Sequence, residues 1–309
     1  MPCGLQIPML QTLHDFDFSY NSFNNCSYSI YFFSCSDAVI SHNTFTNCVP
    51  STSGIDCDAI LLWTTGYGPP AYSPPRMDLI DNVTVSYNTI SNCKHGINLG
   101  TEDYSGQTAT ISNIEVVKNE VSGATEQGIA LYSYRYGDAV PLPTYESISI
   151  HCNLVWRNQV GLGITAFKGP NWNVLDGFSL VGVHVNNNNV YDNDLGGTKQ
   201  GFNVEGDVTM GTVDAKNNWW GSATGPTNPG NPSGTGDKVT DKVVFSPWLT
   251  GLSLCAPSLE TPVGGTWAPI TLQALSSVDT LQLLTPWIAL VLIAAAFSFS
   301  AYKRLFKKR

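Results

Sequence analysis

The sequence predicts an all-β fold built as a parallel β-helix, with three short strands in each rung and about seven rungs. The stretch SHNTFTNC at Ser41–Cys48 recurs as SYNTISNC at Ser86–Cys93 and, more loosely, as SYNSFNNC at Ser19–Cys26. Apolar and polar residues alternate on both sides of the Asn in these stretches, and another short apolar segment follows each of them. Repeats of 22 to 45 residues with strand-like alternation indicate a solenoid whose rungs stack about 4.8 Å apart.

The first two strands of each rung flank a recurring Asn. Apolar residues stand five and three positions before this Asn and two positions after it, as Val83, Val85 and Ile90 do around Asn88. Period-two alternation on both sides of one residue predicts two short strands joined at a corner. Asn suits a corner because it tolerates the left-handed backbone conformation and can hydrogen-bond locally. Seven residues share this position: Asn21, Asn43, Asn88, Asn119, Asn153, Asn188 and Asn218.

The third strand of each rung starts with a small residue, followed by an apolar residue, any residue and usually a second apolar residue. Its copies are Ser29–Phe32, Ala59–Leu62, Gly96–Leu99, Gly128–Leu131, Gly163–Ala166 and Gly201–Val204. If the first apolar residue of each copy faces inward, its two neighbours face outward. The expected outward columns are therefore the small residues and a second set consisting of Tyr31, Leu61, Asn98, Ala130, Thr165 and Asn203.

These repeats resemble those of the right-handed parallel β-helix family, which includes the pectate-lyase-like proteins and periplasmic copper-binding-like repeat proteins. The resemblance covers about residues 14–250 and implies a single-stranded, right-handed parallel β-helix. It extends to NNWWGSATGP at Asn217–Pro226 and KVVFSPWLT at Lys242–Thr250, which look like the closing segment (217–250) of such proteins. Trp219, Trp220 and Trp248 are then expected to cover the last rung. The family hosts lyases, hydrolases, adhesins and stalks, so the fold alone does not define an activity.

The C-terminal residues predict a membrane anchor. Residues 251–285 lack the repeat and form the expected tether. Residues 286–302 are 17 residues without a charge, and residues 303–309 (KRLFKKR) hold five basic residues. This pattern predicts one transmembrane helix over 286–302 and a cytoplasmic tail, with the β-helix of residues 1–250 outside the cell. Because no signal peptide precedes the repeats, we also expect the natural N-terminus to be incomplete.

The charge distribution argues against nucleic acid as a partner. Lys and Arg number 15 and Asp and Glu 24, and the basic tail accounts for five of the basic residues. The remaining residues therefore carry ten basic against 24 acidic side chains. Phosphate binding needs an excess of Lys and Arg, which this part of the chain lacks.

Aromatic residues concentrate in the long segments that follow the third strand. Insertions at one corner of successive rungs project from one side of a solenoid. Aromatic rings with a few polar partners suit a polysaccharide, because a sugar presents an apolar face and a hydroxyl rim. The alternative is that these rings pack their own loops together. The candidate ligand-binding residues are Trp63, Tyr67, Tyr104, Tyr132, Tyr134, Arg135, Phe167, Lys168 and Trp172.

The third strand offers little catalytic chemistry. Its outward columns contain no carboxylate, whereas glycoside hydrolysis uses two carboxyl groups. The resemblance implies acidic Ca²⁺ ligands only if the chain is a polysaccharide lyase, and no other cofactor is expected. Asp58 and His95 stand in the same column on adjacent rungs and form the candidate acid/base pair. The alternative is that this pair is structural.

The cysteines predict a cross-link between rungs. Cys26, Cys48 and Cys93 share one column, and the rung spacing of about 4.8 Å falls within the Cα range of disulfides. Cys26–Cys48 is the preferred pair, and buried thiols are the alternative. No cysteine or histidine spacing matches a zinc site, so no metal is expected.

Together these patterns predict an extracellular, membrane-anchored β-helix that binds polysaccharide or a cell-envelope glycan. One alternative is a polysaccharide lyase or glycoside hydrolase centred on Asp58 and His95. A second is a stalk, surface-layer component or adhesin without a small-molecule site.

Overall fold

A computed structural model describes residues 5–6, 13–26, 29–48, 57–65, 79–103, 109–136, 142–169, 174–206 and 212–258. All of them belong to one compact unit, Met1–Ser258, and the second unit, Leu259–Arg309, lies outside the described residues. The predicted transmembrane helix (286–302), the basic tail and most of the tether therefore lie outside them as well. In the part that is described, no helix is long and apolar enough to span a membrane.

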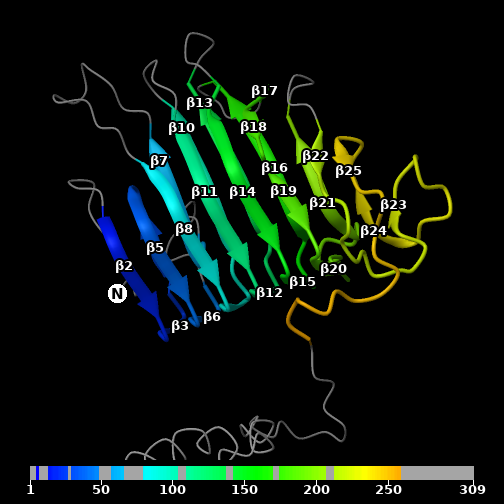
Figure 1. Cartoon of the computed structure of the whole chain (residues 1–309), viewed down its shortest axis with the longest axis horizontal. Coiled ribbons are helices and arrows are strands. Elements are labelled where there is room, and N and C mark those ends of the chain that lie inside the picture. The colour runs from blue at the N-terminus through cyan, green and yellow to red at the C-terminus, as the bar shows by residue number, and fades with distance from the viewer. Residues whose placement is uncertain are drawn as a thin grey trace, which may run out of the picture. The chain divides into compact units, whose positions relative to one another are not determined.

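The described residues form three sheets whose strands run parallel along the main path of each sheet (Figure 1). The first sheet, sheet A, contains β1 (Leu5–Gln6), β4 (Ile30–Phe32), β7 (Ile60–Thr65), β10 (Ile97–Asp103), β13 (Gln127–Arg135), β16 (Val160–Lys168), β21 (Gln200–Glu205), β24 (Gly236–Val239) and β23 (Pro226–Thr227), with β17 (Val174–Leu175) antiparallel to β16. Sheet B contains β2 (Leu13–Ser19), β5 (Cys35–Ser41), β8 (Ile80–Ser86), β11 (Thr110–Val117), β14 (Thr144–His151), β19 (His184–Asn186), β22 (Val213–Asp214) and β25 (Val243–Val244), with β18 (Ser179–Val181) beside β14. Sheet C contains β3 (Ser22–Asn24), β6 (Thr44–Thr46), β9 (Thr89–Ser91), β12 (Glu120–Ser122), β15 (Leu154–Trp156) and β20 (Asn189–Tyr191).

The chain visits sheets B, C and A in turn, so each rung contributes one short strand to each sheet. For example, β8, β9 and β10 follow one another along the chain and pair with β11, β12 and β13 of the next rung. This is the arrangement of a parallel β-helix, and it confirms the predicted all-β solenoid of three strands per rung.

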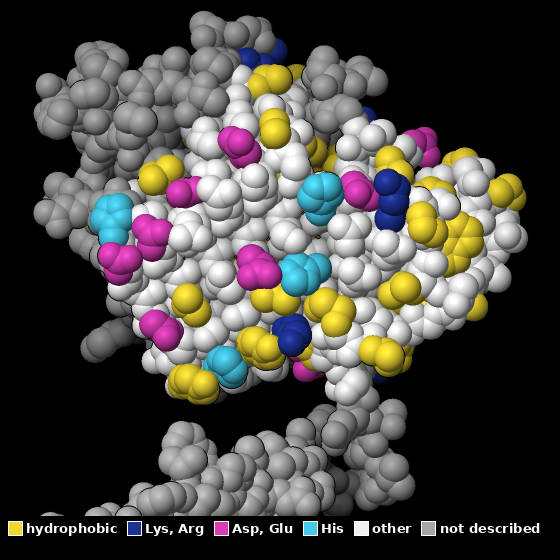
Figure 2. Space-filling model, in the orientation of Figure 1, with side chains coloured by type: hydrophobic (Ala, Val, Ile, Leu, Met, Phe, Trp, Pro, Cys, Tyr) yellow, Lys and Arg dark blue, Asp and Glu magenta, His cyan; other side chains and the backbone are white. Residues whose placement is uncertain are grey.

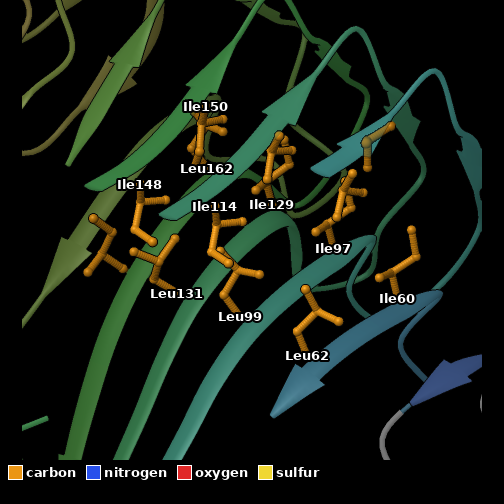
Figure 3. Packing of buried hydrophobic residues seen from close by; sticks show 14 of the residues in the cluster. Ile60, Leu62, Ile97, Leu99, Ile114, Ile129, Leu131, Ile148, Ile150 and Leu162 are labelled. Atoms are coloured by element: carbon orange, nitrogen blue, oxygen red, sulfur yellow. The ribbon is translucent and has the colours of Figure 1, made fainter. Parts of the chain in front are cut away.

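The core is a set of apolar ladders between the sheets (Figure 3). Ile60, Ile97, Ile129 and Leu162 occupy one inward column of sheet A, and each is at most 1% exposed. Figure 3 shows Ile114, Ile148 and Ile150 of sheet B in the same cluster. Because every rung buries the same apolar positions against its neighbours, the core is continuous along the solenoid.

The structure corrects the predicted register in β16. Ile129 pairs with Leu162, and Leu162 pairs with Phe202, so the third-strand copy in this rung is Gly161–Ile164 rather than Gly163–Ala166. Gly163, not Thr165, therefore stands in the column of Ala130. The difference is two residues, which leaves each side chain on the expected face because strand side chains alternate with period two.

The small residues that begin each third strand do not face outward. Ser29 and Ala59 are 0% exposed. A Cβ atom at Gly96 would overlap the Val121 side chain and the Gly128 carbonyl. This column therefore lies inside the corner between sheets C and A, where only small residues fit.

The seven predicted corner Asn residues form one continuous ladder. From Asn43 to Asn218, Oδ1 of each Asn accepts the backbone N–H of the ladder Asn one rung earlier, at 2.8–3.0 Å. Nδ2 of Asn88 donates to Oδ1 of Asn119 (2.9 Å) and to the Ile40 carbonyl (2.9 Å). The left-handed conformation, however, belongs to the residue before each ladder Asn, such as His42 (φ 55°) and Tyr87 (φ 55°). The Asn is thus selected for its buried hydrogen bonds rather than for its backbone conformation.

The C-terminal closing segment covers the last rung in the described part of the chain. Trp220 is 0% exposed, and Trp248 is partly buried against the core. Trp219 forms an isolated parallel bridge with Asn189. The chain then runs back beside earlier rungs, because Ser253 N donates to Oδ1 of Asn189 (2.7 Å).

The disulfides differ from the predicted pair. Cys48 is bonded to Cys93, with Cα atoms 4.4 Å apart, and Cys152 is bonded to Cys255 across 103 residues. The predicted Cys26–Cys48 bond is wrong. Cys48 has a cysteine on each neighbouring rung, and because Cys26 is itself disulfide-bonded, Cys93 is the neighbour left for Cys48. Cys35 is a buried free thiol, and burial raises its pKa to about 12.

The surface carries more acidic than basic side chains. Asp and Glu side chains are scattered over the face shown in Figure 2, where Lys and Arg are few. Some pair with exposed His residues, as Glu115 does with Nε2 of His151 at 2.9 Å. Exposed pairs of this kind contribute little to stability.

Candidate functional site

The outer face of sheet A holds the candidate site, defined here as Asp58, Trp63, His95, Asn98, Glu126, Tyr132, Tyr134 and Phe167. Its residues come from β7, β10, β13 and β16 and from the turns that enter these strands. Asn98 and Ala130 point outward, yet they are only 4% and 0% exposed. Larger side chains therefore lie across this face, since outward positions on a bare sheet would be open to solvent.

Four of the predicted aromatic residues form a cluster on this face: Trp63, Tyr132, Tyr134 and Phe167. The Tyr132 and Tyr134 ring centroids are 5.8 Å apart, and those of Tyr134 and Phe167 are also 5.8 Å apart and stacked. The Trp63 ring lies 5.8 Å from that of Tyr134 and over Gly100, where a Cβ atom would overlap it. The rings thus pack on one another, as the self-packing interpretation expects, but each also stays partly exposed.

Asp58 and His95 meet as their shared column predicts. Nδ1 of His95 donates to Oδ1 of Asp58 at 2.7 Å, and Nδ2 of Asn98 donates to Oδ2 of Asp58 at 2.9 Å. The side chains of His95 and Asp58 are 4% and 1% exposed. The Asp58 carboxylate is therefore enclosed, with one hydrogen bond to each oxygen.

A second carboxylate contacts the other side of the imidazole. Nε2 of His95 lies 3.1 Å from Oε2 of Glu126, and Nζ of Lys94 lies 3.5 Å from Oε1 of the same residue. Burial alone would lower the pKa of His95, but the charge and hydrogen bond of Asp58, together with the contact to Glu126, raise it to about 9. Burial would raise the pKa of Glu126, but His95 and Lys94 hold it below its ordinary value. Near pH 7 the site thus contains an imidazolium between two carboxylates.

Two cavities adjoin this cluster. An open groove of about 590 Å³ runs past the Cys48–Cys93 disulfide, Lys94 and Glu126 to the polar side chains of later rungs; it is also lined by Thr125, Gln127, Gln159, Val160, Asn203 and Glu205. A small cavity of about 30 Å³ lies between the aromatic rings and the His95 pair, lined by Trp63, Lys94, His95, Asn98, Glu126, Tyr132 and Tyr134. Lys94 and Glu126 line both cavities, so the small cavity lies beside the open groove.

Arg135 and Lys168 are not part of the aromatic cluster. Arg135 is 7% exposed and makes a two-pronged contact with Asp176, from Nε to Oδ2 (2.5 Å) and from the terminal nitrogen to Oδ1 (2.7 Å). Lys168 pairs with Arg135 in the register, and strand alternation places both on the opposite face from Tyr134 and Phe167. The prediction grouped both residues with the aromatic side chains because they are close in sequence. In the structure β13 and β16 extend through Arg135 and Lys168, so these side chains alternate to the other face. Tyr67, Tyr104 and Trp172 lie outside the described residues.

Sequence reasoning missed Glu126 and did not assign Asn98 to a site. Glu126 lies just before β13, outside the two outward columns of the third strand. It occupies the same position in its rung as Lys94 does in the preceding rung, and its backbone N–H donates to the Lys94 carbonyl at 3.0 Å. The signal for both residues therefore lies in the turns that precede β10 and β13, not in the strands.

The Asp58–His95 pair is poorly placed to act as a general base. A general base needs an unprotonated form at working pH and access to substrate. His95 is protonated near neutrality and both its nitrogens face carboxylates, while Asp58 is enclosed. Within the described residues, no group of three or more His, Cys, Asp or Glu side chains is placed to hold a metal ion.

No protein-family model, curated protein or solved structure matches the chain. The function must therefore be argued from the site itself.

Proposed function

We propose that the chain is an extracellular, membrane-anchored, right-handed β-helix of the pectate-lyase-like kind that binds a polysaccharide or cell-envelope glycan on the outer face of sheet A. Residues 286–302 anchor it in the bilayer, and the basic tail is cytoplasmic. Asp58 and His95 support the shape of the site rather than bond cleavage. The proposal needs neither a cofactor nor a metal.

One observation carries this proposal: the partly exposed rings of Trp63, Tyr132, Tyr134 and Phe167 stand together beside an open groove that contains charged and amide side chains. Sugar rings stack on aromatic faces, and their hydroxyl groups need donors and acceptors at the edge. The amide, carboxylate and ammonium groups of the groove supply both kinds. The groove touches residues from Cys48 to Glu205, so it crosses several rungs and suits a chain-like ligand.

Titration of the full-length protein in detergent with a panel of oligosaccharides tests the proposal. Trp63→Ala and Tyr132→Ala should weaken the binding of any glycan that the wild type binds by at least about tenfold, which corresponds to ~1.4 kcal/mol. Tyr20→Ala is the matched control, because Tyr20 is an aromatic residue that is 79% exposed at the first corner, away from this face. It should bind as the wild type does.

The two other functions give different results in the same experiment. Release of new reducing or unsaturated ends, lost in His95→Gln, would replace binding with a lyase or hydrolase activity. A protein that binds no glycan in the panel would be a stalk or surface-layer component.

A further inference from the structure

The small cavity beside His95 is the most chemically defined place on this face. Its volume of about 30 Å³ is enough for one group the size of a water molecule. Three aromatic side chains, Trp63, Tyr132 and Tyr134, form part of its wall. It therefore admits a single substituent of a larger ligand rather than a whole sugar ring.

The Asn98 side chain lines this cavity and carries a buried hydrogen-bond acceptor. A carboxylate only accepts hydrogen bonds, so the Asn98 atom that contacts Asp58 at 2.9 Å must be the amide nitrogen. The amide oxygen therefore faces away from Asp58. Asn98 is 4% exposed, lines the cavity, and its Oδ1 has no donor among the described residues. A buried acceptor of this kind destabilises the protein unless a donor satisfies it.

The other polar groups around the cavity favour a cationic donor. The positive charges of His95 and Lys94 already face carboxylates, at 2.7 Å (Asp58), 3.1 Å and 3.5 Å (Glu126). The Glu126 side chain is 43% exposed, so it can still accept from a ligand. The faces of Trp and Tyr rings attract a cation more strongly than a neutral group. An anionic sugar would instead meet Glu126 in the cavity and Glu205 in the adjoining groove, and Lys94, the basic residue that lines both, is paired with Glu126.

We propose that this cavity receives the primary ammonium group of an amino sugar, held by Oδ1 of Asn98, the carboxylate of Glu126 and the rings of Trp63, Tyr132 and Tyr134. This inference rests on the proposed glycan binding and specifies its ligand class. A neutral hydroxyl group would satisfy Asn98 but would gain less from the rings and from Glu126. A uronic acid would be repelled.

Calorimetric titration of the full-length protein compares three probes of equal length: a glucosamine oligomer, its fully N-acetylated form and a galacturonic acid oligomer. We expect the glucosamine oligomer to bind at least about tenfold more tightly than the N-acetylated one. The uronic acid oligomer should bind most weakly. Glu126→Gln should remove about tenfold of the affinity for glucosamine and a smaller part of the affinity for the N-acetylated oligomer, so that the preference for the ammonium group is lost.

Glu205→Gln is the matched control, because Glu205 lines the groove but not the small cavity. It should keep the preference for the ammonium group. Thermal unfolding of both variants shows whether they fold, and Trp63→Phe, which keeps a ring but weakens the attraction for a cation, gives a second readout of the preference.

The outcomes separate the two proposals. Equal or tighter binding of the N-acetylated or uronic acid oligomer would overturn the ammonium site while leaving glycan binding intact. The same holds if Glu126→Gln weakens all three probes alike. Failure of the wild type to bind any of the three, or any other glycan, would overturn the proposed function itself.

Discussion

The Asn corner and the outer face of sheet A both bury polar side chains in columns, but they do so by opposite rules. At the corner, each Asn contacts an identical Asn on the next rung, and donors and acceptors match from Asn21 to Asn218. On sheet A, the column of Asp58 continues as His95, Gln127, Val160 and Gln200, so neighbouring rungs differ. Oδ1 of Asn98 and Oε1 of Gln127 lack donors among the described residues.

The two regions therefore differ in whether their polar groups satisfy one another. Repeated polar groups satisfy one another and stabilise the stack. Polar groups that change from rung to rung cannot form such a ladder, and some are left for a ligand. We therefore expect changes at the corner to act mainly on stability, and changes on sheet A to act mainly on binding.

The largest expected effect comes from breaking the ladder in its middle. Asn119→Ala removes the acceptor of the Asn88 N–H and Nδ2 groups and the donor to the Val85 carbonyl, all of which are buried. Each unsatisfied group costs about 1–3 kcal/mol, so the free energy of unfolding in urea should fall by about 3–5 kcal/mol. Asn24→Ala, at an exposed position of sheet C, should change it by less than about 0.5 kcal/mol. Similar values for the two variants would mean that the ladder is not the stabilising element.

A somewhat smaller effect should appear as a pH dependence from His95. Its pKa is about 9 in the folded protein and 6.5 in the reference state, so folding favours the protonated form. The resulting stability is fully present below pH 6.5 and is lost as the pH rises through 9, up to roughly 3 kcal/mol at ~1.36 kcal/mol per unit. Urea unfolding of the wild type between pH 6 and 10 measures this slope. In His95→Gln the slope over that range should be much reduced, and an unchanged slope would contradict the assignment.

A substitution at Asp237 should stabilise the protein at the second corner, between sheets C and A. There Asn158 and Asn193 begin a second ladder, and Oδ2 of Asp237 accepts from the N–H of Asn193 at 2.9 Å. Burial raises the pKa of Asp237 to about 6, against the hydrogen bonds from Asn193 that lower it. Folding disfavours the charged form, and this cost develops as the pH rises from 3.8 to about 6. Asp237→Asn should therefore raise the free energy of unfolding by roughly 3 kcal/mol at pH 8, at ~1.36 kcal/mol per unit.

The gain from Asp237→Asn should disappear near pH 4, where the native carboxyl group is protonated. Unfolding curves at the two pH values make this comparison within one variant. A gain of equal size at both would show that packing, not charge, is responsible.

The smallest expected change in stability belongs to the aromatic cluster. Trp63→Ala removes a partly exposed ring that rests on Gly100, so we expect a loss of only about 1 kcal/mol in the free energy of unfolding. Its effect on glycan affinity should be the larger one. A loss above about 3 kcal/mol would mean that Trp63 stabilises the fold as strongly as a corner Asn does. That result would contradict the expectation that changes on sheet A act mainly on binding.

The sequence predicted the fold where residues repeat and failed where they do not. The Asn positions and the inward columns follow from periodicity, and the Asp58–His95 contact followed from their shared column. The register of β16 was misread because Gly161–Ile164 and Gly163–Ala166 both match the small–apolar pattern. Arg135 was placed with its aromatic neighbours because sequence proximity does not show that a strand extends and alternates through it. The partner of Cys48 depends on whether Cys26 already forms another disulfide, and the column pattern does not reveal that bond.

The Cys152–Cys255 bond changes the path by which a pulling force reaches the solenoid. It joins the chain that leaves the closing segment to the residue just before the ladder Asn153, two corners back along the stack. A pulling force applied beyond residue 258 therefore acts through this disulfide on the rung of Asn153. The final strands β22 and β25 lie within the 103-residue loop that this bond closes and carry no tension themselves. A solenoid pulled through its C-terminal chain would therefore resist peeling from its last rung, because the force bypasses that rung.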